Sequence, residues 1–354
     1  MPQKSGLLQL ADLLYPKQVA HPVPQGTLMS AMAPLPQVGQ HELSSLLYAP
    51  VKASESPWAF VTRRFYSFQS NLAITDRQRQ DGVTKFKGLV STLNAAYRGH
   101  RSDSENAFMI GSWAKDTHIR RPRDVDMYYV LPTDVYNRFE TYALGVNKQS
   151  ALLQEVKGKL LASYPSSVIR GDGPVVLADF HGWTVEIVPV FYYCDTERSY
   201  YACDTKNGGK YIKTMPLHEV EAIDAAEKRA NNNVRPLIRM LKCWQSYCNV
   251  PIRSFHLELL AIEFLDSWSY KEYSLFFYDW MCRDFFKWMI SRANNFVWAP
   301  GTYELMFLGD AWKSRAESAY GRAAKAEMFE QENKMVEAGE EWQKIFGNDI
   351  LRNV

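Results

Sequence analysis

The chain has 354 residues, of which 46% are apolar, 14% aromatic and 23% charged, as is typical of a soluble globular protein with room for two domains. Its 41 basic and 39 acidic residues give a net charge of +2, which argues against a strongly basic face for duplex nucleic acid. No stretch approaches the roughly 18 apolar residues of a membrane span, and Gln9 and Asp12 interrupt the only leader-like segment. We therefore expect a cytoplasmic protein that does not enter a membrane.

The amino-terminal segment, residues 1–57, holds eight of the 17 prolines. No apolar period survives such spacing, so we predict an extended or disordered arm. Packing of this arm on the surface of the core stays open as the alternative. The five cysteines form no CxxC pair, so neither a disulfide framework nor a zinc site is expected.

Two helices open the ordered part of the chain. Order is expected to begin near Trp58, and FVTRRFYSFQSNL, residues 60–72, predicts a short helix that breaks at Ala73 and Ile74. Thr75 and Gln78 then have the spacing of a capping box, which predicts a second helix that reaches about Tyr97.

Strand patterns follow this second helix. Residues 107–130 predict strands around a polar loop, and residues 135–163 predict helical structure. Residues 175–193 predict two strands joined by a turn at His181 and Gly182. Residues 58–215 are therefore predicted to form one mixed α/β domain.

Beyond about Met215 the pattern is helical, and residues 216–354 are predicted to form a second domain. In VRPLIRMLKCWQSY, four apolar residues form one stripe and four polar residues form another. The apolar stripe is Leu237, Leu241, Trp244 and Cys248, and the polar stripe is Arg235, Arg239, Lys242 and Ser246. Pro236 suits the first turn of this helix, Ser254 is a favourable N-cap for the next one, and Gly347 is a plausible stop for the last.

Three carboxylates form the strongest candidate for a site. Asp124 and Asp126 lie one residue apart at the start of a strand, so both side chains point to the same face. Glu186 lies in the apolar strand TVEIVPVF, where a charge has no packing role, and this strand could pair beside the first. Like charges held together require a cation. We predict a site for two Mg²⁺ ions, with Mn²⁺ as a substitute, at which these acids are both metal ligands and catalytic residues.

A second motif precedes the aspartates by twelve residues. Gly111 lets the backbone approach a ligand closely, and Ser112 with its neighbouring amides can donate to phosphate oxygens. A glycine–serine pair alone carries almost no information. Its spacing from the two aspartates makes a nucleotide-phosphate site the better interpretation.

The chain resembles the polymerase-β-like nucleotidyltransferases in GSWAKDTHIRRPRDVDMYYVL and VEIVPVF. Through RPLIRMLKCWQSYCNVPIRSFHLELLAIEFL and EEWQKIFG it resembles more narrowly the bacterial CD-NTases of anti-phage CBASS systems. These are relatives of cyclic GMP-AMP synthase and the 2′-5′-oligoadenylate synthases. The resemblance covers roughly residues 58–346.

The resemblance implies a role for each matching residue. Asp124, Asp126 and Glu186 would hold two metal ions, and Ser112 would bind the triphosphate. Further nucleotide contacts would come from the helical domain: Lys242 to the donor triphosphate, Ser254 to a second phosphate, and Phe255 stacked on the donor base. This chain departs from the family pattern in having Glu186 where aspartate is common and Asp116 where many relatives have glycine.

Structural alternatives exist for the residues of the helical domain. Lys242 shares its stripe with Arg235 and Arg239, and such a basic face is usually solvated. Ser254 could only cap its helix, and Phe255 could be a core residue. His118 has the character of a surface residue.

The expected fold is α+β: a bilobal polymerase-β-like nucleotidyltransferase, with a mixed α/β catalytic lobe, a helical carboxy-terminal lobe and the active site in the cleft between them. The implied activity is template-independent synthesis of a cyclic di- or trinucleotide second messenger from nucleoside triphosphates, ATP among them. The product, rather than the protein, would bind a downstream effector. The alternatives are nucleotide addition to an RNA end or a protein, and a non-catalytic nucleotide-binding module.

Overall fold

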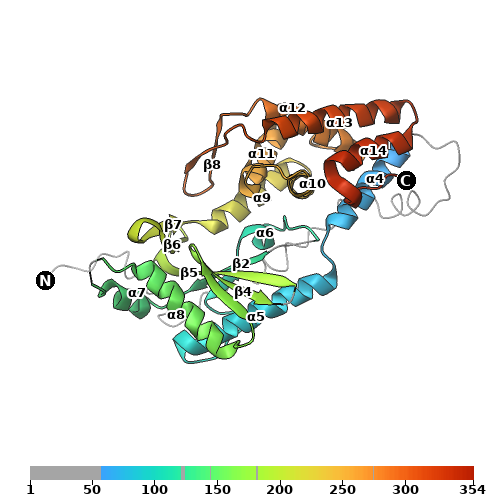
Figure 1. Cartoon of the computed structure of the whole chain (residues 1–354). Helices are drawn as coiled ribbons and strands as arrows, with labels where there is room; N and C mark the ends of the chain where they lie inside the picture. Colours follow the sequence, from blue (N-terminus) through green and yellow to red (C-terminus); the bar gives the residue numbers. More distant parts are fainter. Residues whose placement is uncertain (1–56, 121–123, 144, 181, 274) are drawn as a thin grey trace. The chain divides into compact units, whose positions relative to one another are not determined.

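The computed structural model describes residues 57–120, 124–143, 145–180, 182–273 and 275–354. All but the last residue of the predicted arm therefore lies outside the described residues. The chain forms two compact units (Figure 1). Unit 1 contains residues 81–110 and 124–213, and unit 2 contains residues 57–80, 111–120 and 214–354. Neither unit is continuous in sequence, because the segment after Ile110 belongs to unit 2.

Unit 1 is built on a sheet of seven strands. They are β1 (Ala107–Met109), β2 (Asp124–Val130), β3 (Val168–Asp172), β4 (Val175–Phe180), β5 (Trp183–Cys194), β6 (Ser199–Asp204) and β7 (Lys210–Thr214). The main order is β1-β2-β5-β4-β3, and β6 joins β5 to β7. The β2–β5 pair is parallel, whereas β1–β2, β3–β4, β4–β5 and β5–β6 are antiparallel. The hairpin predicted within residues 175–193 is thus confirmed as β4 and β5.

Helices cover this sheet. They are α5 (Asp76–Arg98), whose first turn lies in unit 2, α7 (Thr133–Glu140) and α8 (Lys148–Ser163), with the short 3₁₀ helix η1 (Lys206–Gly208) before β7. The predicted capping box is confirmed at the start of α5, where the amide of Gln78 donates to Thr75 Oγ1 over 3.2 Å and the amide of Thr75 donates to Gln78 Oε1 over 3.0 Å. The helical structure predicted over residues 135–163 is confirmed and forms two helices, because α7 ends at Thr141 and Asn147 caps the start of α8.

Unit 2 is mainly helical. It contains α4 (Pro57–Leu72), α6 (Gly111–Ala114), α9 (Pro216–Arg229), α10 (Val234–Tyr247), α11 (Ser254–Ser267), α12 (Tyr278–Ile290), α13 (Lys313–Gln331) and α14 (Met335–Phe346). The short elements are η2 (Leu275–Phe277), η3 (Gly347–Asp349) and a hairpin of β8 (Phe296–Trp298) and β9 (Leu305–Phe307). Within the described part of the chain, no helix is long and apolar enough to cross a membrane.

The core of unit 2 surrounds α10. Leu237, Leu241 and Trp244 of the predicted apolar stripe are completely buried, and α10 packs against α4, α11 and α14. Burying this stripe supplies the main force that holds α10 in place, at roughly 1.5–3 kcal/mol for each large side chain. The last helix stops as predicted at Gly347, whose φ of +69° favours glycine.

Candidate functional site

The three predicted carboxylates lie on one face of the sheet in unit 1. Strands β2 and β5 run parallel, with Asp126 directly opposite Glu186 and Asp124 opposite Thr184. The alternating residues Val125 and Val185 are fully buried on the other face, so packing of the apolar face turns the acids away from it. The predicted pairing of these strands is confirmed, and it brings together acids from distant parts of the chain.

The carboxylates disturb one another electrostatically. Burial raises the pKa of Glu186, and the charges of Asp126, Asp124 and Asp172 raise it further, to about 7. A hydrogen bond with Asp126 acts in the same direction. Asp172 was missed by the sequence interpretation, since it ends β3, with a turn and β4 between it and Glu186. Negative charge therefore accumulates on this face.

These acids fit a divalent cation that is bound together with a phosphate ligand. Among the described residues, no three Asp, Glu, His or Cys side chains form a ready-made metal cage. Mg²⁺ rarely uses such a cage, because it prefers one or two carboxylates together with substrate phosphates and water. The mutual repulsion of Asp124, Asp126 and Glu186 is the condition that a cation would relieve.

Ile110, the residue before the Gly111–Ser112 turn, is hydrogen-bonded to the strand that carries Asp126. The amide of Ile110 donates to the carbonyl of Asp126 over 2.9 Å. Gly111 has a φ of +58°, a conformation that glycine adopts without steric cost. The loop then folds back on itself, because the amide of Thr117 donates to the carbonyl of Ser112 over 2.9 Å.

The three residues Lys115–Thr117 of this loop are each bound by the polar stripe of α10. Arg235 Nε donates to the carbonyl of Lys115 (2.8 Å), Arg239 Nη2 to the carbonyl (2.7 Å) and Oδ2 (2.8 Å) of Asp116, and Lys242 Nζ to Oγ1 of Thr117 (2.9 Å). Consecutive loop residues thus meet side chains spaced by about one helical turn. The alternative of a solvated basic face is wrong for this stripe.

Asp116 shows why glycine suits its position. Its φ is +51°, a left-handed conformation that costs most residues roughly 1–2 kcal/mol and that Asp tolerates better than most. The side chain is held by Arg239. The neighbouring His118 was expected at the surface, but it is buried and stacked on Trp113, and this burial lowers its pKa to about 4.

A buried carboxylate on α11, Glu258, connects the loop to α10. Its Oε1 accepts from Lys242 Nζ over 2.6 Å and from Thr117 Oγ1 over 3.0 Å, and its Oε2 lies 2.6 Å from Lys115 Nζ. Burial by itself raises the pKa of Glu258, but the ammonium groups of Lys242 and Lys115 outweigh this effect and hold the pKa down at about 2. Lys115 also pairs with Glu219 over 2.9 Å. The sequence interpretation missed Lys115 and Glu258.

The remaining predicted residues lie at the start of α11. Ser254 was predicted as the N-cap of α11, but Arg253 occupies the N-cap position and Ser254 is the first helical residue. Its exposed hydroxyl donates to Oε1 of Gln245 over 2.8 Å. The half-buried ring of Phe255 has its centroid 4.8 Å from Lys115 Nζ, which is a cation–π distance. Phe255 is therefore in direct contact with the network around Glu258.

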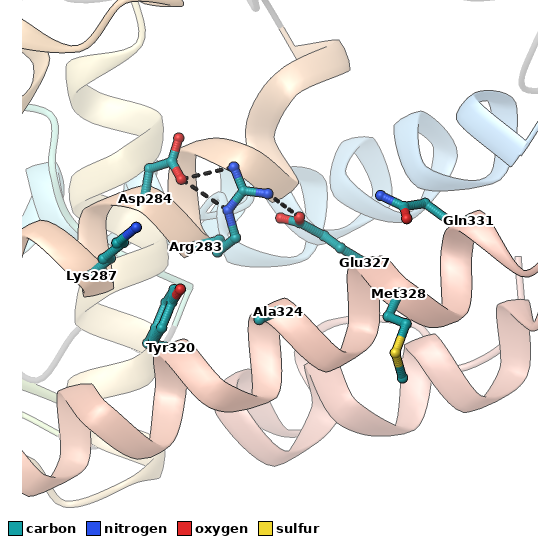
Figure 2. A pocket seen from close by; sticks show the side chains of 8 residues that line it. All are labelled: Arg283, Asp284, Lys287, Tyr320, Ala324, Glu327, Met328 and Gln331. Carbon is teal, nitrogen blue, oxygen red and sulfur yellow. Dashed lines mark hydrogen bonds and ion pairs between the residues drawn. The ribbon is translucent and has the colours of Figure 1, made fainter.

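The predicted residues thus fall into two sets. Asp124, Asp126 and Glu186 belong to unit 1, and Gly111, Ser112, Lys242, Ser254 and Phe255 belong to unit 2. A pocket of about 320 Å³ between α12 and α13 contains none of them (Figure 2). Arg283 in this pocket forms ion pairs with Asp284 and Glu327, so two other residues that line the pocket neutralise its charge (Figure 2).

Comparison with known proteins shows a domain model and relatives to which this chain is similar. The model of the Second Messenger Oligonucleotide or Dinucleotide Synthetase domain matches residues 60–227. The CBASS oligonucleotide cyclase CdnC of Escherichia coli (strain KTE188) is 28% identical over 205 residues, which cover 54% of this chain and 62% of that protein. A probable cyclic nucleotide synthase of Bacillus cereus (strain VD146) is 22% identical over 323 residues, which cover 80% of this chain and 92% of that protein. The chain thus spans less than two thirds of the length of the Escherichia coli relative.

Solved structures show the same fold. The structure of CdnC of Escherichia coli MS115-1 with ATP has a TM-score of 0.62 at 19% identity, covering 82% of this chain and 98% of that one. Vibrio cholerae DncV cyclic AMP-GMP synthase in complex with the linear intermediate 5′ pppA(3′,5′)pG has a TM-score of 0.56 at 14% identity, covering 88% and 89%. The expected α+β fold is therefore confirmed, and it is the fold of CdnC and DncV.

Proposed function

We propose that the chain joins nucleoside triphosphates into a cyclic di- or trinucleotide, because its residues 60–227 match the model of the Second Messenger Oligonucleotide or Dinucleotide Synthetase domain. The observation that carries this proposal is the in-register pair of Asp126 and Glu186, with Asp124 on the same face. In each step the hydroxyl of one nucleotide attacks the α-phosphorus of another, and pyrophosphate leaves. Repetition within one molecule closes the ring.

Asp124, Asp126 and Glu186 would hold the metal ions. Bound Mg²⁺ or Mn²⁺ supplies Lewis-acid stabilisation of the charge that develops on the phosphate oxygens. The protein's part is to keep three carboxylates on one rigid sheet face, where the parallel β2–β5 pair sets their spacing.

The loop that begins at Gly111 would hold the triphosphate. Ser112 offers a hydroxyl and the turn offers backbone amides, both of which suit phosphate oxygens. Lys115 and Lys242 place two ammonium groups on the same loop network. Ser254 and Phe255 lie at the start of α11, beside this network, as contacts for a second phosphate and for the base.

The biological role proposed for the product is a second messenger in anti-phage defence. Support comes from the relatives, since CdnC carries the name of a CBASS oligonucleotide cyclase and DncV that of a cyclic AMP-GMP synthase. ATP is the first substrate to test, because CdnC has been solved with ATP. The effector would bind the product and need not contact this chain.

One experiment separates this function from its alternatives. The purified chain is incubated with each radiolabelled nucleoside triphosphate and with all four together, in Mg²⁺ or Mn²⁺, and the products are treated with phosphatase and separated by thin-layer chromatography. A small phosphatase-resistant product supports cyclisation. Label on an added RNA or on a protein would instead indicate nucleotide transfer, and nucleotide binding without product would indicate a binding module.

A further inference from the structure

The network around Glu258 carries an inference about the residues that prepare the triphosphate site. Glu258, Lys115, Thr117 and Lys242 are all at least nine-tenths buried, although three of them are charged. Removing such charges from water costs several kcal/mol per ion, and a buried ion pair often adds little net stability. A well-packed apolar cluster would hold α10, α11 and the loop at lower cost. Stability alone therefore does not explain why these charged residues are buried together.

The contacts of Glu258 lead to three residues predicted to bind nucleotide. It contacts Lys242 directly over 2.6 Å. It reaches Phe255 through Lys115, whose ammonium group lies 2.6 Å from Oε2 and 4.8 Å from the ring centroid. It reaches Ser112 through Thr117. The hydroxyl of Thr117 is hydrogen-bonded to Glu258 and Lys242, and its amide donates to the carbonyl of Ser112, so these contacts restrain the loop.

We propose that Glu258 is a positioning residue for the triphosphate site: its carboxylate orients Lys115 and Lys242 and, through Thr117, fixes the backbone of Ser112. The inference rests on the proposed function and gives a role to a residue to which the family resemblance assigned none. Lysine side chains lose much rotamer entropy when they are fixed, so holding two of them before substrate arrives lowers the entropy cost of binding. Glu258 itself need not touch the nucleotide.

The charges of the network explain why a carboxylate is needed. Lys115 and Lys242 contribute two positive charges, and Glu258 and Glu219 contribute two negative charges. Glutamine at position 258 keeps the size of the side chain but leaves one positive charge without its partner. Aspartate keeps the charge and withdraws the carboxylate by one methylene group. The aspartate variant therefore separates position from charge.

The test compares Glu258→Asp and Glu258→Gln with the same changes at Glu263, an exposed glutamate on the same helix. Two quantities are measured on the full chain at a temperature where it is folded: the affinity for a non-hydrolysable ATP analogue with Mg²⁺, and the hydrogen-exchange rate of the Thr117 amide. We expect Glu258→Asp to weaken the analogue at least tenfold and to accelerate exchange at Thr117 at least tenfold. Both Glu263 variants should match the parent.

A result in which folded Glu258→Asp matches the parent in both quantities would overturn the proposal, because Glu258 would then only neutralise charge. If the Glu258 variants do not fold, Thr117→Val tests the same link, since it deletes only the hydroxyl between Glu258 and Lys242. It should accelerate exchange at its own amide at least tenfold, and Thr117→Ser should restore the parent rate. Parent-like exchange in Thr117→Val would contradict the proposal.

Failure of the proposed function would look different. A parent chain that binds no ATP analogue and makes no product from nucleoside triphosphates refutes the nucleotidyltransferase function. The exchange rate of the Thr117 amide needs no nucleotide, so it still decides whether Glu258 positions the loop.

Discussion

Asp126 and Glu186 lie directly opposite each other on the parallel strands β2 and β5, and the charge of Asp126 helps burial to raise the pKa of Glu186. When both carboxylates are charged, their repulsion lowers the stability of the folded protein. A bound cation would remove this repulsion. The next three predictions rest on this relationship.

Replacing both aspartates by their amides, Asp124→Asn with Asp126→Asn, should abolish product formation in a protein that stays folded. Metal stabilisation of a transferring phosphoryl group is worth several kcal/mol, so activity should fall by at least about a hundredfold. The melting temperature in metal-free buffer should hold or rise, because the repulsion with Glu186 is removed. Substantial synthesis by the double variant would be incompatible with the metal mechanism.

The stability of the metal-free protein should depend on the ionisation of Glu186. Its pKa is raised to about 7 in the folded state, above the ordinary value of 4.5. A raised pKa means that the group favours folding below about pH 4.5, and that this contribution is lost as pH rises through about 7. Glu186→Gln, which imitates the protonated acid, should therefore melt near the parent temperature at pH 5 and above it at pH 8. Equal differences at both pH values would show that Glu186 is not coupled to its neighbours.

Adding Mg²⁺ provides the matching measurement for the same residue. The parent at pH 8 should gain thermal stability with Mg²⁺, because ligand binding to the folded state stabilises it. Glu186→Gln should gain less, since it has lost one charged ligand. A gain that is identical in the two proteins would place the cation elsewhere.

A fourth prediction concerns the left-handed conformation of Asp116. Asp116→Gly and Asp116→Ala both lose the contact of the side chain with Arg239, but only glycine adopts a φ of +51° without steric cost. The alanine variant should therefore be less stable than the glycine variant by about 1 kcal/mol. Urea unfolding of the two proteins measures this difference directly. Equal stabilities would mean that the loop relaxes when the Arg239 contact is lost.

The last prediction tests the ring of Phe255. Stacking on a base is worth roughly 1–3 kcal/mol and is tolerant of base identity, so Phe255→Ala should weaken ATP and GTP alike by roughly five- to 150-fold. Phe255→Leu keeps apolar bulk and should behave like the alanine variant, whereas Phe255→Tyr should be nearly silent. Competition binding with a fluorescent ATP analogue compares all three. If leucine binds as well as phenylalanine, the position requires bulk rather than an aromatic face.

Local periodicity allowed the sequence by itself to determine much of the fold. The spacing of Asp124 and Asp126 predicted that both side chains share one face of a strand, and the apolar run around Glu186 predicted a strand beside it. The spacing of Thr75 and Gln78 predicted the start of α5, since the two residues satisfy each other's backbone groups. The apolar stripe of α10 predicted which face enters the core. Each of these patterns acts within a few residues of the chain.

Tertiary structure alone decided the partners of the polar residues. The sequence showed that Arg235, Arg239 and Lys242 share one face of α10, but not that this face meets the loop Lys115–Thr117. The sequence also did not show that Glu258 is buried among polar partners, because these partners lie in the loop after α6 and on α10. Periodicity reports which side of an element avoids water. The choice of a hydrogen-bond or ion-pair partner depends on segments that meet only when the chain has folded, where burial makes each unsatisfied charge too costly to leave alone.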